Sequence, residues 1–460
     1  MRRLIGTALC LALVIGCVPE EVLPVLDRQQ EKPALDEAPA LDEAPSQDEA
    51  PVQNDNDDTP VVRDIPAMPV LAPQVNGSVG AVSLTPEQIA YNNAAGRLAF
   101  RVLDKLYQGE SLVFSPLSLQ MALSMTLNGA EGETEQEMLE VLGFGQDGTA
   151  ALNVYGKSLL EQLPAVDASV NMQMADAVIA NDNYPIAPDF QELVGEVYYA
   201  SVANMPFDDG QGVKKVVNDW CNQSTKGLIP EILDEVTSTA MAYLLNALYF
   251  KAGWSTPFDP DYQVKPELPF YGASSTVKID FLATGEHLPY LEGDSFQMVT
   301  RPFGEKSAYE MAILLPNEKS TLADVVKECQ AKAWNDILAQ QKSTRVHLEV
   351  PKFQTESAHD LKETLMLLGM KRAFSDNAQF GRLFVKGEAY ISRVFQKAKL
   401  VLDENGVEAA AVTVVQTGGT SPGPGTVVEY VPFVANHPFV YTIFERSSGT
   451  ILFAGVFDGK

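Results

Sequence analysis

The residues with the clearest chemical implication lie at 404–425, near the end of the chain. Residues 404–416 begin acidic and continue as a run of small and β-branched side chains, which is typical of a strand. They lead directly into Thr-Gly-Gly-Thr-Ser-Pro-Gly-Pro-Gly at 417–425, which neither a central strand nor a helix would keep. A strand-forming segment joined to a flexible tip indicates an exposed loop that can later enter a sheet. Such a loop stores conformational energy, and it is not a conventional catalytic site.

Residues for conventional catalysis or metal binding are sparse. The four histidines are too far apart in sequence to suggest a zinc pair: His287, His347, His359 and His437. A catalytic triad built on His437 is disfavoured, because the chain shows no nucleophile elbow in which a serine joins a strand to a helix. We therefore expect no cofactor, no metal site and no enzymatic activity.

The chain is acidic and long enough to form a large core. Its 460 residues are 46% hydrophobic and carry a formal net charge of −28. Phosphate binding needs clustered lysine and arginine, so nucleic acid is disfavoured as a partner. Much of the acidity is local, since residues 18–83 contain 14 acidic and 3 basic side chains.

The N-terminus has the pattern of a secretory signal. A basic Arg2-Arg3 start is followed by an apolar run at 4–15, which is too short for a stable membrane span. A small residue then leads into Cys17, which resembles the lipobox of bacterial lipoproteins. That resemblance implies a signal peptide at 1–16 and a lipid on Cys17; the alternative is an ordinary signal in which Cys17 is incidental. Neither residue after Cys17 is Asp, so we expect a bacterial envelope protein held at the outer membrane or cell surface.

Residues 17–83 are expected to form a lipidated, disordered tether, and residues 84–460 one globular domain. The tether repeats Ala-Leu-Asp-Glu-Ala-Pro at 34–39 and 40–45, is acidic and Pro-rich, and lacks aromatic residues. It therefore cannot bury enough surface to fold. A cation-binding tail is the alternative interpretation of its charge. The domain keeps two cysteines, Cys221 and Cys329, and the sequence leaves open whether they pair.

Helix signals come first in the domain and strand signals later. Thr85-Pro86 and Ser115-Pro116 each combine a capping hydroxyl with a proline in the first turn, which predicts two helices. Apolar stretches predict strands at 241–250, 309–315, 345–350, 398–402, 439–444 and 451–456. Helices followed by strands, without regular alternation, favour an α+β fold.

Separated blocks of the domain are similar to those of one family. They are Phe-Ser-Pro-Leu-Ser-Leu at 114–119, Asn-Asp-Trp at 218–220 with Thr-Lys-Gly-Leu-Ile at 225–229, Leu-Asn-Ala-Leu-Tyr-Phe-Lys-Ala-Gly-Trp at 245–254, Val-Pro-Lys-Phe at 350–353, Leu-Gly-Met at 368–370, and Phe-Val-Ala-Asn-His-Pro-Phe-Val at 433–440. In this order they resemble the serpins over residues 84–460. Core packing could account for single blocks, but the ordered set is specific. The resemblance implies a serpin fold, with helices around a large central sheet, two smaller sheets and an exposed reactive loop.

The resemblance also implies a mechanism, and serpins are themselves a standard example of strand addition. A target protease attacks the exposed tip, and at the acyl-enzyme stage the loop inserts into the central sheet and distorts the protease. The implied hinge of this loop comprises Glu404, Gly406, Val407, Glu408, Ala409, Ala410 and Ala411. One face of the inserted strand would carry Val407, Ala409, Ala411, Thr413 and Val415. None of these is charged, so they can enter a sheet without a large desolvation cost.

The spacing from the hinge glutamate in inhibitory serpins places the scissile bond at Thr420-Ser421. Thr420 suits a shallow pocket, so the expected targets are elastase-like or subtilisin-like serine proteases, with cysteine proteases as an alternative. We therefore expect a monomeric, lipid-anchored suicide-substrate inhibitor. The alternative is a non-inhibitory serpin that acts as a binding module, while an enzyme of unrelated class is disfavoured for lack of a catalytic constellation.

The resemblance further implies a cluster where the central strands part, formed by Ser115, Ser118, Asn246, Trp254 and Gln396. Many serpins have His at the position of Gln396, and Thr or Ser at that of Val407. Gln396 can donate and accept hydrogen bonds, so we expect a substitute network. It has no titrating group, and we expect loop insertion to be insensitive to pH between roughly 6 and 8 at this site.

Overall fold

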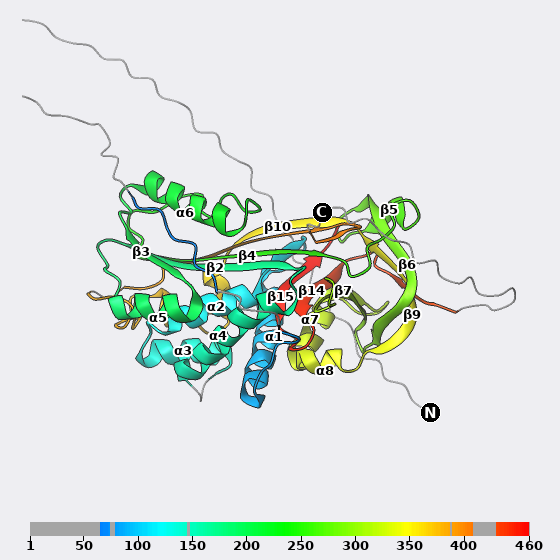
Figure 1. The fold of residues 1–460 in the computed structure, drawn as a ribbon, viewed down its shortest axis with the longest axis horizontal. Coiled ribbons are helices and arrows are strands. Elements are labelled where there is room, and N and C mark those ends of the chain that lie inside the picture. Colours follow the sequence, from blue (N-terminus) through cyan, green and yellow to red (C-terminus); the bar gives the residue numbers. More distant parts are fainter. Residues whose placement is uncertain (1–64, 74–78, 145–147, 387–388, 408–428, 460) are drawn as a thin grey trace, which may run out of the picture. The chain divides into compact units, whose positions relative to one another are not determined.

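The structure, a computed structural model, describes residues 65–73, 79–144, 148–386, 389–407 and 429–459 (Figure 1). The lipidation residue Cys17, the hinge residues 408–411 and the scissile bond Thr420-Ser421 lie outside these ranges. Within them, no helix combines the length and apolar character needed to cross a membrane. Helices dominate the first part of the domain and strands the remainder, which confirms the α+β prediction.

A six-stranded sheet contains the predicted hinge. Its strands follow the order β10-β11-β12-β4-β2-β3. Their bounds are Phe353–Asp360 (β10), Arg393–Leu402 (β11), Gly406–Val407 (β12), Ala242–Gly253 (β4), Asn171–Asn181 (β2) and Ser201–Met205 (β3). Two of its contacts are parallel, β11 with β4 and β3 with β2, and the others are antiparallel.

The other sheet of the described ranges has nine strands, in the order β1-β15-β14-β8-β7-β6-β9-β13, with β5 paired to β6. Their bounds are Leu112–Phe114 (β1), Val264–Tyr271 (β5), Thr276–Glu292 (β6), Phe296–Phe303 (β7), Tyr309–Pro316 (β8), Lys342–Pro351 (β9), Val431–Val434 (β13), Phe439–Glu445 (β14) and Ile451–Phe457 (β15). The family resemblance implies two smaller sheets beside the central one. In the structure, β6 pairs with strands on both sides and joins them in this single nine-stranded sheet. Its 17 residues are long enough to pair with β5 at one end and with β7 at the other.

Two helices begin where the sequence predicts them. Helix α1 (Pro86–Leu106) starts with a capping box formed by Thr85 and Gln88, and α2 (Pro116–Leu127) is capped by the Ser115 hydroxyl. The other helices with described bounds are α3 (Gly132–Leu142), α4 (Gly148–Val166), α5 (Pro188–Tyr198), α6 (Gly210–Ser224), α7 (Leu322–Ala331), α8 (Trp334–Leu338) and α9 (Lys362–Leu367). Cys221 of α6 and Cys329 of α7 are buried free thiols, so they do not pair with each other.

The central sheet separates two apolar layers, because side chains alternate along its strands. On one face, Val217 and Trp220 of α6 pack with Ile179 of β2 and Tyr243 of β4. Even-numbered residues of β2 and β4 face the opposite way, into the main core. This alternation decides which polar side chains of the two strands lie beneath α2.

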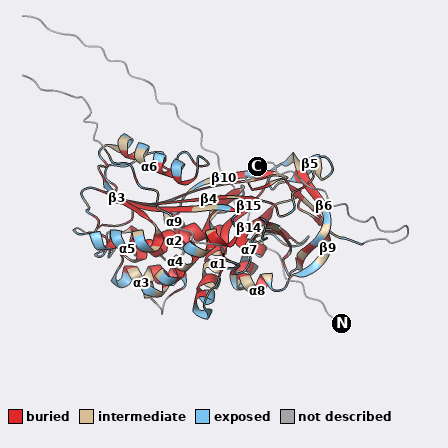
Figure 2. Cartoon of the chain, viewed as in Figure 1, coloured by how far each residue is buried: buried red, intermediate tan, exposed pale blue. Residues whose placement is uncertain are grey.

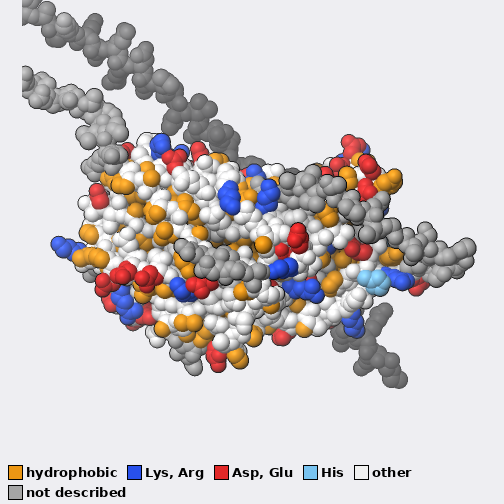
Figure 3. Space-filling model, viewed as in Figure 1, with side chains coloured by type: hydrophobic (Ala, Val, Ile, Leu, Met, Phe, Trp, Pro, Cys, Tyr) orange, Lys and Arg blue, Asp and Glu red, His pale blue; other side chains and the backbone are white. Residues whose placement is uncertain are grey.

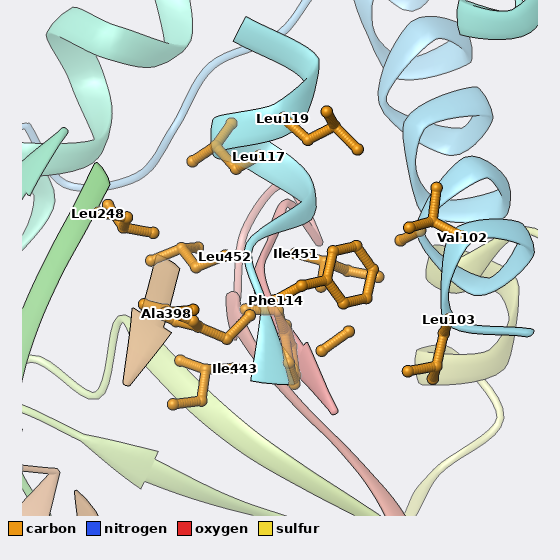
Figure 4. Packing of buried hydrophobic residues seen from close by; sticks show 14 of the residues in the cluster. Val102, Leu103, Phe114, Leu117, Leu119, Leu248, Ala398, Ile443, Ile451 and Leu452 are labelled. Carbon is orange, nitrogen blue, oxygen red and sulfur yellow. The ribbon is translucent and has the colours of Figure 1, made fainter. Parts of the chain in front are cut away.

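The main core lies between α1, α2 and strands of both sheets. In Figure 4, Phe114 of β1 and Ile451 of β15 lie between Val102 of α1 and Ala398 of β11. Helix α2 is buried along its whole length, and Figure 2 shows the same concentration of buried residues at the centre of the domain. The N-terminal end of α2 is therefore fixed against the central sheet.

Residues 65–73, which the sequence assigns to the tether, pack against the domain. Met68 is 6% exposed and joins the apolar cluster of α6, β2 and β3, with Ile65 beside it. The carbonyl oxygen of Pro69 accepts a hydrogen bond from the Ser201 hydroxyl at the start of β3. We call residues 65–73 the strap, because they follow the edge of the central sheet at β3.

Truncation of Met68 should destabilise the domain, although the sequence places this residue in the tether. We expect Met68→Ala to lower the free energy of unfolding by about 2 kcal/mol, because it removes buried apolar surface and leaves a cavity. Equilibrium unfolding of the uncleaved protein in urea measures the effect. Leu367→Ala is the matched control at a position 73% exposed, and it should change little. Equal effects of the two substitutions would contradict the packing of the strap.

Candidate functional site

The described hinge residues lie between β4 and β11 at one end of the central sheet. Val407 pairs with Leu402 of β11 and with Ala252 of β4, so β12 is already inserted as a short strand. Beyond it, β11 and β4 pair directly with each other, residues 393–397 with 243–247. We call this direct parallel contact the seam. Any extension of β12 along the sheet requires the seam to open.

Gly406 turns the chain into the sheet. Its φ of 141° lies in the region that favours glycine, and a Cβ at this position would collide with the carbonyl oxygen of Ala252 and with Gly253. Val407 follows with its side chain 2% exposed, packed into the main core. The local sequence Gly-Val thus allows a sharp turn followed at once by burial.

Glu404 and Trp254 hold the chain just before this turn. Glu404 forms an ion pair with Lys352, with Oε2 and Nζ 2.5 Å apart. Burial raises the pKa of Glu404, but the hydrogen bond and positive charge of Lys352, together with a backbone hydrogen bond, outweigh burial, so this pKa lies below its ordinary value. The Trp254 indole donates to the Asp403 carbonyl at 3.0 Å and stacks on Phe303 with ring centroids 4.3 Å apart.

Four of the predicted site residues form one hydrogen-bonded cluster at the seam. Gln396 of β11 accepts from the Ser115 N–H at 2.8 Å, and its Nε2 donates to the Ser115 carbonyl at 2.9 Å and to Asn246 Oδ1 at 3.1 Å. Asn246 of β4 donates to the Ser118 carbonyl at 2.9 Å and accepts from the Ser118 hydroxyl. All four residues are at most 2% exposed. The bond between Gln396 and Asn246 crosses the seam, so it must break when the seam opens.

One titratable residue also belongs to this cluster and a second lies beside it, and the family motifs do not reveal them. Asp176 of β2 is the register neighbour of Asn246 and accepts a hydrogen bond from its Nδ2 at 2.5 Å. His359 of β10 is paired with Gln396, and its Nε2 lies 3.2 Å from the Val113 carbonyl oxygen. A sequence signal for Asp176 exists, since it is the one charged residue in the apolar stretch 174–180. The expectation of a cluster without a titrating group is therefore corrected.

Burial shifts the pKa values of these two groups in opposite directions. It raises the pKa of Asp176 to about 7, although the hydrogen bond from Asn246 lowers it. Burial lowers the pKa of His359, although the contact with the Val113 carbonyl raises it. The cluster therefore contains a carboxyl group that titrates near neutral pH, and the imidazole beside the cluster is neutral there.

Trp254 does not join the cluster around Gln396. It follows β4, which ends at Gly253, and lies beside the hinge, whereas Asn246 lies in the middle of the strand. Among the residues that the structure describes, no three His, Cys, Asp or Glu side chains form a group that could hold a metal ion. Basic and acidic side chains are interspersed over the face shown in Figure 3. The described residues thus bring together a short inserted strand, a parallel contact beyond it and a buried hydrogen-bonded cluster that spans this contact.

Known proteins share this architecture over most of the chain. Residues 92–458 match the family model described as Serpin (serine protease inhibitor). Intracellular coagulation inhibitor 2 of Tachypleus tridentatus is 30% identical over 361 residues, which cover 76% of this chain and 86% of that protein. Serpin B8 of Homo sapiens is 29% identical, with coverage of 78% and 96%.

Solved structures agree with the sequence relatives. The crystal structure of the thermophilic serpin tengpin in its native state has a TM-score of 0.75 at 27% identity, and covers 84% of this chain and 98% of its own. Thyroxine-binding globulin in complex with thyroxine has a TM-score of 0.71 at 24% identity, with coverage of 80% and 98%, which shows the shared fold. Serpins are generally inhibitors of serine proteases and not enzymes. With the family match spanning nearly the whole domain, this chain belongs to the serpin family.

Proposed function

We propose that the protein inhibits proteases as a suicide substrate, through cleavage of its reactive loop, covalent trapping of the protease and insertion of the loop into the central sheet. The observation that carries this proposal is β12, which lies between β4 and β11. Among the described residues, the sheet beyond β12 is closed by the parallel seam alone. Insertion would replace the seam with two antiparallel contacts, whose pairing is slightly more stable per residue.

The register of β12 indicates which loop residue would reach the cluster at the seam. Six residues beyond Val407 the loop carries Thr413, and the same step along both neighbouring strands reaches Asn246 and Gln396. An inserted Thr413 would lie between these two side chains and on the same face. Its hydroxyl can accept from Gln396 and donate to Asn246, replacing the hydrogen bond that insertion breaks. The buried cluster would thus keep its hydrogen bonds after insertion.

A charge on the inserting face should convert the inhibitor into a substrate. Ala411→Glu would carry a carboxylate into the main core between Ala398 and Leu248 only when the loop inserts, so insertion would slow relative to hydrolysis and the yield of covalent complex should fall about tenfold or more. Denaturing gel electrophoresis after incubation with protease measures this yield. Glu408→Gln changes charge on the opposite face and should leave the yield unaltered. Equal yields from Ala411→Glu and the unmodified protein would contradict insertion.

We propose elastase-like or subtilisin-like serine proteases as targets, with cleavage at Thr420-Ser421. Small uncharged residues surround this bond, including Gly418 and Gly419, and the tip at 417–425 contains no Lys or Arg. A shallow specificity pocket accepts such residues, whereas a trypsin-like pocket needs a basic side chain.

Incubation with elastase or subtilisin should give an SDS-stable complex, while trypsin should give none through this bond. The released C-terminal peptide should begin at Ser421, which mass spectrometry can measure. The cleaved inhibitor should unfold at a much higher temperature, because its loop has become a strand. If every protease cleaves the protein and none forms a covalent complex, the proposed inhibitory function is contradicted and a binding module is favoured. Complexes with cysteine proteases alone would replace the proposed target class.

We also propose that a lipid on Cys17 anchors a monomeric inhibitor at the bacterial outer membrane or cell surface. The support is the basic and apolar pattern of residues 2–15 followed by Cys17. Cys17→Ala should move the protein from the membrane fraction to the soluble fraction of a bacterial host, and the unmodified protein should incorporate labelled palmitate. Membrane association that persists in the variant would contradict the lipid anchor.

A further inference from the structure

Asp176 has no assigned part in loop insertion, although it lies in the cluster that insertion must disrupt. It is 3% exposed in the middle of β2, on the face covered by α2. Register pairs place His359, Gln396, Asn246 and Asp176 in one row across four neighbouring strands. The seam runs through this row between Gln396 and Asn246, so Asp176 lies one strand away from the point of opening.

The elements packed around Asp176 place no cation against it in the described part of the chain. Helix α2 carries no titratable residue. Tyr198 of α5 faces the carboxyl group; burial is the main cause of its raised pKa, and Asp176 adds to it. On α4, Lys157 and Glu161 pair with each other near the surface. His359 lies at the other end of the row, and α6 covers the opposite face of the sheet.

A buried carboxylate without a cation is unstable relative to a hydrated one. Asn246 offers a single hydrogen bond to Asp176 Oδ1, and this bond does not compensate for burial, since the pKa is raised to about 7. At neutral pH the closed sheet therefore contains both protonation states. Opening the seam admits water to the edge of β4 at Asn246, which relieves the ionised state more than the neutral one.

We propose that Asp176 is a positioning residue for loop insertion: its protonated form holds the centre of the sheet closed, and its ionised form favours opening of the seam. The inference rests on the insertion mechanism proposed above. Asp176 acts through Asn246, because their hydrogen bond keeps Nδ2 directed at β2 and leaves Oδ1 for Ser118 and Gln396. Asp176 therefore controls both the orientation of the Asn246 amide and the ease with which the hydrogen bond between Asn246 and Gln396 breaks.

Linkage gives the direction of the pH dependence. The closed sheet binds the Asp176 proton more tightly than an opened or unfolded chain, in which an aspartate has a pKa of about 3.9. Protonation of Asp176 therefore stabilises the closed sheet in full below about pH 4, and this stabilisation is lost as the pH rises toward about 7. Insertion should accelerate by up to about tenfold between pH 6 and pH 8, because the open state binds fewer protons.

His359 should not produce this profile. Its pKa is lowered by burial, so it is neutral across this pH range and takes up a proton only in more acidic solution. Protonation of His359 would also disfavour the closed sheet, which is the opposite direction of pH dependence. The effects of Asp176 and His359 on the insertion rate can therefore be distinguished by the pH range in which each occurs.

The test compares the full-length protein with Asp176→Asn, a neutral isostere, and with His359→Gln as the control. The second-order rate of covalent complex formation with one protease is measured from pH 6 to pH 8.5. Dividing the unmodified rate by the variant rate at each pH cancels the titration of the protease. We expect this ratio to rise several-fold for Asp176→Asn and to stay flat for His359→Gln. A flat ratio for Asp176→Asn would overturn the proposal.

Equilibrium unfolding in urea gives a readout that does not need inhibition. The free energy of unfolding of Asp176→Asn, relative to that of the unmodified protein, should increase as the pH rises from 5 to 8. If the difference between the two proteins is the same at pH 5 and pH 8, the proposal is also overturned. Asp176→Ser serves the same purpose if the amide variant does not fold. Failure of the unmodified protein to form any complex would remove the insertion mechanism and this role with it, whereas complexes with a flat ratio would remove the role alone.

Discussion

The fold depends on the seam, a parallel contact in which residues 393–397 of β11 meet 243–247 of β4. Elsewhere in the described central sheet only β2 and β3 are parallel, and β12 occupies the space between β11 and β4 beyond the seam. The chain therefore folds with a short line of direct contact that a further strand could replace. A state of this kind owes its lifetime to the barrier against rearrangement as well as to its free energy.

Under the proposed insertion mechanism, side-chain hydrogen bonds would contribute to that barrier together with backbone hydrogen bonds. Gln396 and Asn246 use both ends of their amide groups, and each is anchored to the N-terminal turn of α2 through Ser115 or Ser118. In a buried site such bonds are strong, and a group left without its partner is costly. The cluster members on β4 and β11 can each keep their partners on α2 while the bond between them is lost.

Local signals predict the elements, while tertiary pairing decides the site. Capping residues locate the starts of α1 and α2, and apolar stretches locate six strands, because these signals act over a few residues. Gln396 and Ser115 are distant in sequence, and only the family resemblance groups them. Asp176 is overlooked because a single acid in an apolar strand has no partner nearby in sequence. The division into two smaller sheets fails because strand pairing along β6 is not a local property.

The strap moves the start of the folded domain toward the N-terminus. Residues 65–73 contribute Met68 to the apolar layer beneath α6 and bind β3 through Pro69, so they belong to the folded unit. A cut in the chain anywhere before Ile65 would leave the strap, the seam and the reactive loop together. If the proposed lipid on Cys17 anchors the protein, such a cut would therefore release the folded domain with its strap intact.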